Sequence, residues 1–197
     1  SALRRGQVWI TMAVIATGFG GSFAVYSYIT PVLTEVSGLA TAAVPLALAV
    51  FGLGMTLGNQ VGGRLAEAAP VRTIATGLAA AAVSMALFAL TASSPVFALI
   101  TLFALAFTTT ATTPALATRL MDAGREGPTL GAALHHAAFN VSNALGAALG
   151  ALVLAAGWGW TAPAAVATVL PLLGLAALGV AVRMERSERR EELALAA

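Results

Sequence analysis

The residue types that could do chemistry gather in two places along this chain. In one of them, Arg64 and Glu67 directly follow a run of glycines spaced four residues apart. The other is the stretch 130–155, where several polar side chains stand among apolar residues: His135, His136, Asn140, Ser142 and Asn143. An arginine and a carboxylate in a short loop can pair in one conformation and separate in another, which is what a conformational switch requires. We therefore interpret Arg64 and Glu67 as a candidate switch.

The polar residues of 130–155 recur at helical spacing. His136, Asn140 and Asn143 stand at i, i+4 and i+7, so a helix would carry them on one face. Polar side chains within a membrane usually face the protein interior or a wet cavity, which makes these three residues, with Tyr28, candidates for substrate contact. Two alternatives stay open: the asparagines could form hydrogen bonds between helices, and Tyr28 could anchor the membrane interface.

Catalysis and metal binding find little support in the sequence. Ser142 and His135 are seven residues apart and could share a helix face, but no third group orients the histidine, so we do not expect an enzyme. The chain contains no cysteine, and no set of ligands converges to suggest a metal site. We expect no cofactor.

The composition indicates a membrane protein. Of the 197 residues, 59% are hydrophobic and only 9% are charged, and the mean hydropathy is +0.90. A water-soluble fold of this size could not bury so much apolar surface, so its solvent is the lipid bilayer. The formal net charge of +2 is too small to indicate nucleic acid as a partner.

Charge-free stretches predict six membrane-crossing helices. These stretches run over 6–34, 36–63, 73–118 and 127–182, and the last two are long enough for two crossings each. Breaking residues divide them at Ser93-Ser94-Pro95 and at 157–163. The predicted spans are about 8–34, 42–62, 72–92, 96–118, 130–155 and 161–182, within a bundle over 1–182 that is followed by a charged tail over 183–197.

The arginines predict the orientation of the spans. All ten fall before the first span, between the second and third, between the fourth and fifth, or after the sixth, which is one side of the membrane. By the positive-inside rule that side is cytoplasmic, so both termini are expected inside the cell.

Small residues and prolines suggest both packing and an internal repeat. Glycines at i, i+4 spacing let helices approach closely in lipid, and we expect Gly54, Gly58, Gly146 and Gly150 to serve helix packing together with Pro31 and Pro114. Thr-Pro recurs in the first and fourth spans, and Gly-x-x-x-Gly recurs in the second and fifth. These echoes predict an all-α membrane fold built as a 3+3 inverted repeat, which forms one half of many transporters.

Three motifs resemble the major facilitator superfamily. Gly58-x-x-x-Gly62-Gly63-Arg64-Leu65-Ala66-Glu67 resembles its loop motif between helices 8 and 9. The segment 28–35 resembles the end of helix 7 in the drug:H+ antiporter subgroup, and 138–150 resembles helix 11 of arabinose-efflux-permease-like members. The motifs occur in order, and the resemblance covers essentially the whole chain, but only the second half of the family's fold. One departure is Ala68, where the family often has a second basic residue.

The resemblance implies a secondary transporter of the efflux type, working by alternating access in a bacterial plasma membrane. It assigns the inward/outward switch to Gly58, Gly62, Gly63, Arg64 and Glu67, and it implies a proton gradient as the energy source. The expected partners are the bilayer, a small organic substrate and a second six-helix bundle, either an N-terminal half or another copy. The beginning of the chain resembles a linker between halves, which favours a C-terminal half. The alternative is a membrane packing or assembly module that transports nothing.

Overall fold

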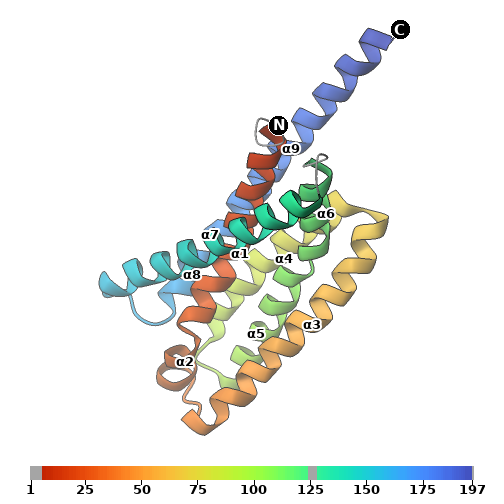
Figure 1. Cartoon of the computed structure of the whole chain (residues 1–197). Coiled ribbons are helices and arrows are strands. Elements are labelled where there is room, and N and C mark those ends of the chain that lie inside the picture. Colours follow the sequence, from red (N-terminus) through yellow and green to blue (C-terminus); the bar gives the residue numbers. More distant parts are fainter. Residues whose placement is uncertain (1–5, 124–127, 197) are drawn as a thin grey trace.

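The computed structural model describes residues 6–123 and 128–196, which form helices and no strand (Figure 1). Six helical segments are long and apolar enough to cross a membrane, so the predicted all-α fold with six membrane-crossing helices is confirmed. The helices are, in chain order, α1 (Gly6–Ser27), α2 (Ile29–Pro31), η2 (Val32–Val36), η3 (Thr41–Ala43), α3 (Val44–Ala68), α4 (Pro70–Thr91), α5 (Pro95–Thr110), α6 (Thr113–Ala123), α7 (Pro128–Ala155), α8 (Ala162–Ala167) and α9 (Val169–Ala196).

Prolines mark where several of these helices begin. In α3, α4, α5 and α8 a proline occupies the first or second position, where its missing N–H breaks no helical hydrogen bond. Ala69, the single residue between α3 and α4, has φ −155° and ψ 74°. A residue before a proline is pushed out of the helical region, so Pro70 ends α3 and begins α4 in one step.

Three spans that we expected to be single helices are interrupted, including the sixth, which is divided into α8 and α9 at Thr168. The first leaves the α-helix at Tyr28 and continues through α2 into η2, a π-helix, because Pro31 has no N–H to bond the carbonyl of Ser27. The fourth is divided into α5 and α6 at residues 111–112, just before Pro114, and the Thr112 hydroxyl donates to the Thr109 carbonyl at 2.7 Å. From residue 183 onward, where we expected a charged tail, α9 continues to Ala196.

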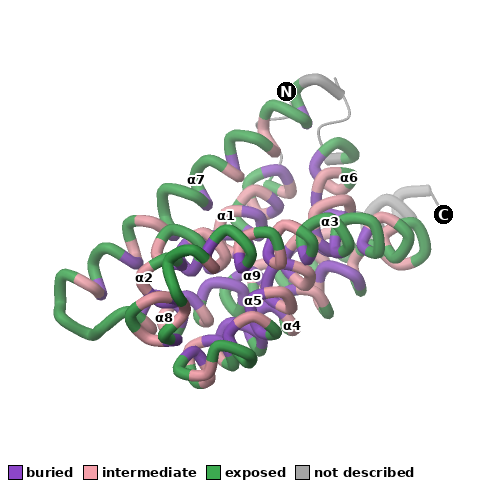
Figure 2. The backbone as a smooth tube through the Cα atoms, turned by 90° about the horizontal axis from the view of Figure 1, so that it is seen from below, coloured by how far each residue is buried: buried purple, intermediate pink, exposed green. Residues whose placement is uncertain are grey.

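Helix α1 lies at the centre of the bundle and is buried along most of its length (Figure 2). It packs against α7 and α9, while α5 packs against α3 and α4. Glycines in α1 allow its neighbours to pack closely against it. A Cβ at Gly21 would lie 2.8 Å from the Ala167 carbonyl oxygen, and one at Gly18 would lie 2.7 Å from the Leu78 side chain. Helices α3 and α7, by contrast, expose long faces.

The glycines of α3 lie directly on the backbone of the fourth span. A Cβ at Gly54 would lie 2.7 Å from the Phe103 carbonyl oxygen. Cβ atoms at Gly58 and Gly62 would collide with the carbonyl oxygens of Phe107 and Ala111 in turn. Three glycines four residues apart therefore meet three carbonyls four residues apart, and we call this contact the glycine ladder. Gly63 is not part of it, because a Cβ there would meet nothing within 4 Å.

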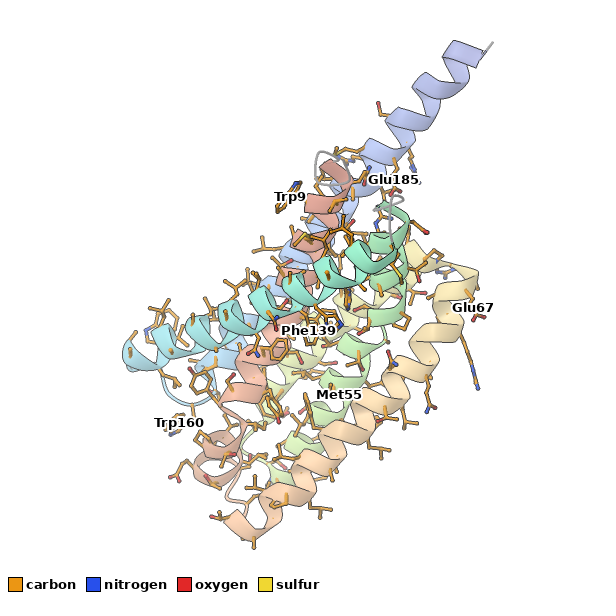
Figure 3. All side chains as sticks on the ribbon, in the orientation of Figure 1. Trp9, Met55, Glu67, Phe139, Trp160 and Glu185 are labelled. Carbon is orange, nitrogen blue, oxygen red and sulfur yellow. The ribbon has the colours of Figure 1, made fainter. Side chains whose placement is uncertain are left out.

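Both termini lie at the same end of the bundle as the α3–α4 turn and the facing ends of α6 and α7 (Figure 1). Trp160, between α7 and α8, lies at the opposite end from Glu185 (Figure 3). Among the described residues, the end of α3, the start of α4, the end of α6 and the outer part of α9, which carry arginines, therefore lie at one end of the bundle.

The glycine ladder predicts that two adjacent glycines respond oppositely to the same substitution. Gly62→Ala forces a methyl group into the backbone of Ala111, and we expect it to destabilise the bundle by about 1–3 kcal/mol. Gly63→Ala meets no atom and improves helix propensity, so its thermal midpoint should be equal or higher.

Thermal unfolding of the detergent-purified variants, followed by size-exclusion chromatography, measures both effects. Equal midpoints for the two variants would contradict the assignment of close backbone packing to Gly62.

Candidate functional site

A groove of about 430 Å³ opens between α3 and α7. Its floor and walls come from α1, α3, α5, α6 and α7, which the sequence separates widely. In Figure 3 the labelled Met55 and Phe139 lie on α3 and α7, on either side of the opening. The residues that line the groove are Phe19, Met55, Thr56, Asn59, Gln60, Thr110, Thr113 and Phe139, and none of them carries a formal charge.

The polar wall of the groove is placed by the glycine ladder. Asn59 and Gln60 follow Gly58 by one and two residues, which turns them about 100° and 200° away from the ladder. While Gly58 presses against α5, these two amides therefore face away from it and remain exposed. The Thr110 hydroxyl lies 2.7 Å from the Ala106 carbonyl oxygen and 3.1 Å from that of Met55, so its hydrogen-bonding joins α5 to α3 beside the groove.

The opposite wall is aromatic. The ring centroids of Phe19 and Phe139 are 5.1 Å apart, and those of Phe23 and Phe139 are 5.0 Å apart with nearly perpendicular planes. The imidazole ring of His135 also stacks on Phe139, with the two ring centroids 6.4 Å apart. Its Nδ1 atom is buried and has no hydrogen-bond partner among the residues that the structure describes. Phe139 is thus held from both helices, α1 and α7, and presents a fixed apolar surface to the groove.

The exposed surface of α7 is divided into two flanks. His136, Asn140 and Asn143 are exposed, and within the described residues their side chains form no hydrogen bond. The other flank exposes large aliphatic side chains at Val141, Leu145 and Leu152. Ser142, in contrast, is fully buried and bonds α1, with its hydroxyl 2.9 Å from the carbonyl oxygens of both Ile15 and Ala16.

Helix α3 shows the same division. Leu53, Leu57, Val61 and Leu65 are exposed on one flank, and Thr56, Asn59 and Gln60 are exposed on the other. Apolar side chains suit contact with lipid, whereas amides without partners do not. The polar flank borders the groove, so the two helices separate a lipid-compatible surface from a polar one.

Tyr28 lies outside the groove and joins α1 to α7. Its hydroxyl donates to the Ala147 carbonyl at 2.9 Å, and its ring covers Gly150, where a Cβ would collide with it. Gly146 lies against the backbone of Gly20 and Ala24 in α1. Of the four residues predicted for substrate contact, the three on α7 therefore share an exposed face, and Tyr28 is used in helix packing.

Arg64 and Glu67 are both exposed at the end of α3, and within the described residues neither has an ion-pair partner. The structure instead shows an ion pair that sequence reasoning missed: Arg119 of α6 and Glu185 of α9, at 2.6 Å. The Arg119 side chain is 11% exposed and that of Glu185 is 40% exposed. Nothing in the sequence pairs residues 66 positions apart, because their meeting depends on how α6 and α9 pack.

Sequence reasoning also missed the groove residues. Asn59 and Gln60 are the only amides in the charge-free stretch 36–63, which was a usable signal. Phe19 and Phe139 gave none, since a phenylalanine in an apolar helix is ordinarily a packing residue. In the parts of the chain that the structure describes, no group of three or more His, Cys, Asp or Glu side chains could hold a metal ion.

Comparisons with known proteins agree with this architecture. The sequence model of the Major Facilitator Superfamily matches residues 2–196. The chain is 30% identical over 192 residues to the inner membrane transport protein YdhP of Escherichia coli K12, covering 98% of this chain and 48% of that protein. It is 28% identical to the putative transporter AraJ of the same strain, covering 98% and 50%. It is 30% identical over 161 residues to the chloramphenicol resistance protein of Streptomyces lividans, covering 82% and 40%. The chain thus spans about half the length of the curated relatives it matches.

The Arg119–Glu185 pair predicts a recoverable loss of stability. Arg119→Gln leaves Glu185 without its partner in a partly buried place, and we expect a cost of about 1–3 kcal/mol. The reversed pair, Arg119→Glu with Glu185→Arg, should recover part of that loss because opposite charges face each other again.

Thermal midpoints of Arg119→Glu, Glu185→Arg and the double variant that combines them, compared as a double-mutant cycle, measure the coupling. Additive losses in the double variant would show that the pair does not stabilise α6 against α9.

Proposed function

The chain belongs to the major facilitator superfamily, and from that premise we propose that it is one six-helix half of an alternating-access transporter that exports a small organic molecule. The observation that carries this proposal is the division of α3 and α7 into an aliphatic flank and a polar flank beside the groove. Exposed amides at the middle of a membrane-crossing helix are costly against lipid. A second bundle that covered the polar flanks would enclose the groove and turn it into the wall of a substrate pathway.

The position of the chain within the whole transporter follows from the motifs. Gly58–Glu67 and 138–150 resemble the family's helices 8 and 11, so we assign the chain to the C-terminal half, to be paired with an N-terminal half or with another copy. Export is supported by the resemblance to efflux members and by the name of the Streptomyces relative. We assign the arginine-bearing end to the cytoplasm of a bacterial cell, with the bundle in the plasma membrane.

Helix contacts support a 3+3 inverted repeat. Such a repeat exchanges the first span with the fourth and the second with the fifth. The glycines of α3 in the second span pack on α5 in the fourth, and the glycines of α7 in the fifth pack on α1 in the first. The same kind of contact therefore occurs at the two positions that the repeat would make equivalent.

The switch role of Arg64 and Glu67 is supported by their lack of partners. Both are exposed at the end of α3, the helix that also carries Asn59 and Gln60. Their partner groups would belong to the second bundle in one conformation and be released in the other. Gly58 and Gly62 take part by fixing this helix to the fourth span, and Gly63 leaves its exposed surface free of side chain. The spans predicted from the sequence contain no Asp or Glu, so for coupling to protons we propose His135 and His136 of the fifth span.

If the chain is part of a transporter, a substitution at Asn140 should reduce transport without reducing the amount of protein in the membrane. Asn140→Ala removes an exposed amide from the polar flank of α7 and touches no packing contact, so drug export should fall by about tenfold or more at equal membrane abundance. Val141→Ala, one residue away on the aliphatic flank, is the matched control and should export normally.

Export by both variants is measured as the accumulation of a panel of antibiotics in cells that produce the protein, normalised to the amount of protein in the membrane. A fall in abundance without a change in export per molecule would favour a packing or assembly module instead.

A substitution at Arg64 should likewise change export without changing the stability of the fold. Arg64→Ala should abolish export while thermal stability is unchanged, because within the described residues its side chain bonds nothing. Arg72→Ala changes another exposed arginine at the same end of the bundle and should have little effect. Equal losses of export in both variants would indicate that only the total positive charge of this end matters.

A further inference from the structure

We infer that the groove between α3 and α7 binds the uncharged, aromatic part of a neutral substrate, through the amides of Asn59 and Gln60 and the ring of Phe139. This inference rests on the proposed transport function and names the chemical class that this bundle would select. Three features of the groove favour such a ligand: its lack of charge, its unused hydrogen-bonding groups and its aromatic wall.

The first feature is the lack of formal charge. The lining is made of amide, hydroxyl, thioether and phenyl groups only. Along α3 the nearest acidic residue is Glu67, seven positions after Gln60 and so about 10 Å farther along the helix. A charged ligand that left water for such a groove would lose its hydration without gaining an opposite charge, which disfavours it far more than a neutral ligand.

The second feature is the unused hydrogen-bonding capacity. Within the described residues the side chains of Asn59 and Gln60 form no hydrogen bond, so each offers an acceptor oxygen and a donor NH₂ group to a ligand. A neutral molecule with amide or hydroxyl groups can satisfy donors and acceptors together. A carboxylate could use only the donors, and an ammonium group only the acceptors.

The third feature is the aromatic wall. Phe139 is fixed by Phe19, Phe23 and His135 around it, so its exposed surface is presented in one orientation. A ligand ring can stack on or meet the edge of such a surface. Met55, across the groove and exposed, can adapt its flexible thioether to rings of different shape. Cations are also attracted to aromatic faces. Because no carboxylate is among the described residues that line the groove, however, the phenylalanine rings alone would compensate little of the hydration that a cation loses.

The experiment compares three aromatic probes that differ in charge: chloramphenicol, which is neutral, tetraphenylphosphonium, which is a cation, and 4-nitrobenzoate, which is an anion. Binding to the detergent-purified protein is measured by titration of its thermal midpoint, and export is measured in producing cells. We expect chloramphenicol to bind at least about tenfold more tightly than either charged probe.

The variant Asn59→Asp changes one amide into a carboxylate of the same size. It should weaken chloramphenicol about tenfold and favour tetraphenylphosphonium, whereas Asn59→Leu should weaken chloramphenicol without favouring the cation. Thr91→Ala, at the exposed end of α4 where the hydroxyl bonds only its own helix, is the control and should keep the wild-type order.

Two results would overturn the inference. The first is binding of a charged probe as tightly as chloramphenicol, with the Asn59 variants sensitive to it; transport would stand and the charge class would be wrong. The second is an unchanged probe order in Asn59→Asp and Gln60→Glu, or binding of none of the three probes. Failure of the transport proposal itself shows separately, as wild-type cells that export no compound of the wider antibiotic panel.

Discussion

Close backbone contact between α3 and α5 is the constraint on which the groove depends. Lipid supplies no hydrophobic force that drives helices together, so association relies on van der Waals contact and on interhelical hydrogen bonds. At Gly54, Gly58 and Gly62 the missing side chains let carbonyl oxygens of the fourth span touch the surface of α3. Because the contact uses backbone on both sides, it fixes the rotation of α3 about its own axis. That rotation decides which residues face lipid and which face the groove.

A second glycine contact fixes the other wall. Gly146 lies on the backbone of α1, and Gly150 lies under the ring of Tyr28, whose hydroxyl bonds the Ala147 carbonyl. Ser142 adds a buried hydroxyl that bonds α1 one turn away. The face of α7 that carries Asn140 and Asn143 is thereby turned outward, with Phe139 between that face and α1. Both walls of the groove are thus set by small residues that lie outside it.

The sequence predicts the number of helices and the packing glycines because both depend on local patterns. A crossing needs about 20 uncharged residues, and glycines four apart share one face whatever the helix meets. Where helices break inside a span was predicted less well. Pro31 and Pro114 were visible, but a tertiary contact at the end of the π-helix Val32–Val36, the bond from the Ser37 hydroxyl to the Ala92 carbonyl at 2.6 Å, was not.

The site was only partly predictable, since it requires knowing which helices meet. The polar stripe of α7 follows from helical spacing alone. That Asn59 and Gln60 face Phe139 does not, because the rotation of α3 is set by its contact with α5 and the position of Phe139 by contacts with α1. For Tyr28 the sequence left ligand contact and interface anchoring open, and it could not indicate the hydrogen bond to the Ala147 carbonyl, which depends on how α7 lies against the first span. Arg119 and Glu185 likewise meet only through the packing of α6 on α9.

The arrangement along α3 also suggests how binding and switching would be coupled. One uninterrupted helix, Val44–Ala68, carries Asn59 and Gln60 in the groove and, at its end, Arg64 and Glu67, which form no ion pair with any described residue. The glycine ladder fixes that helix to the fourth span over about two turns, so it moves as part of the bundle and does not bend independently. A ligand held at the amides and a partner held at Arg64 would therefore act on the same rigid body. Coupling needs a change in the orientation of whole bundles rather than a signal passed through side chains, which is the kind of motion that alternating access uses.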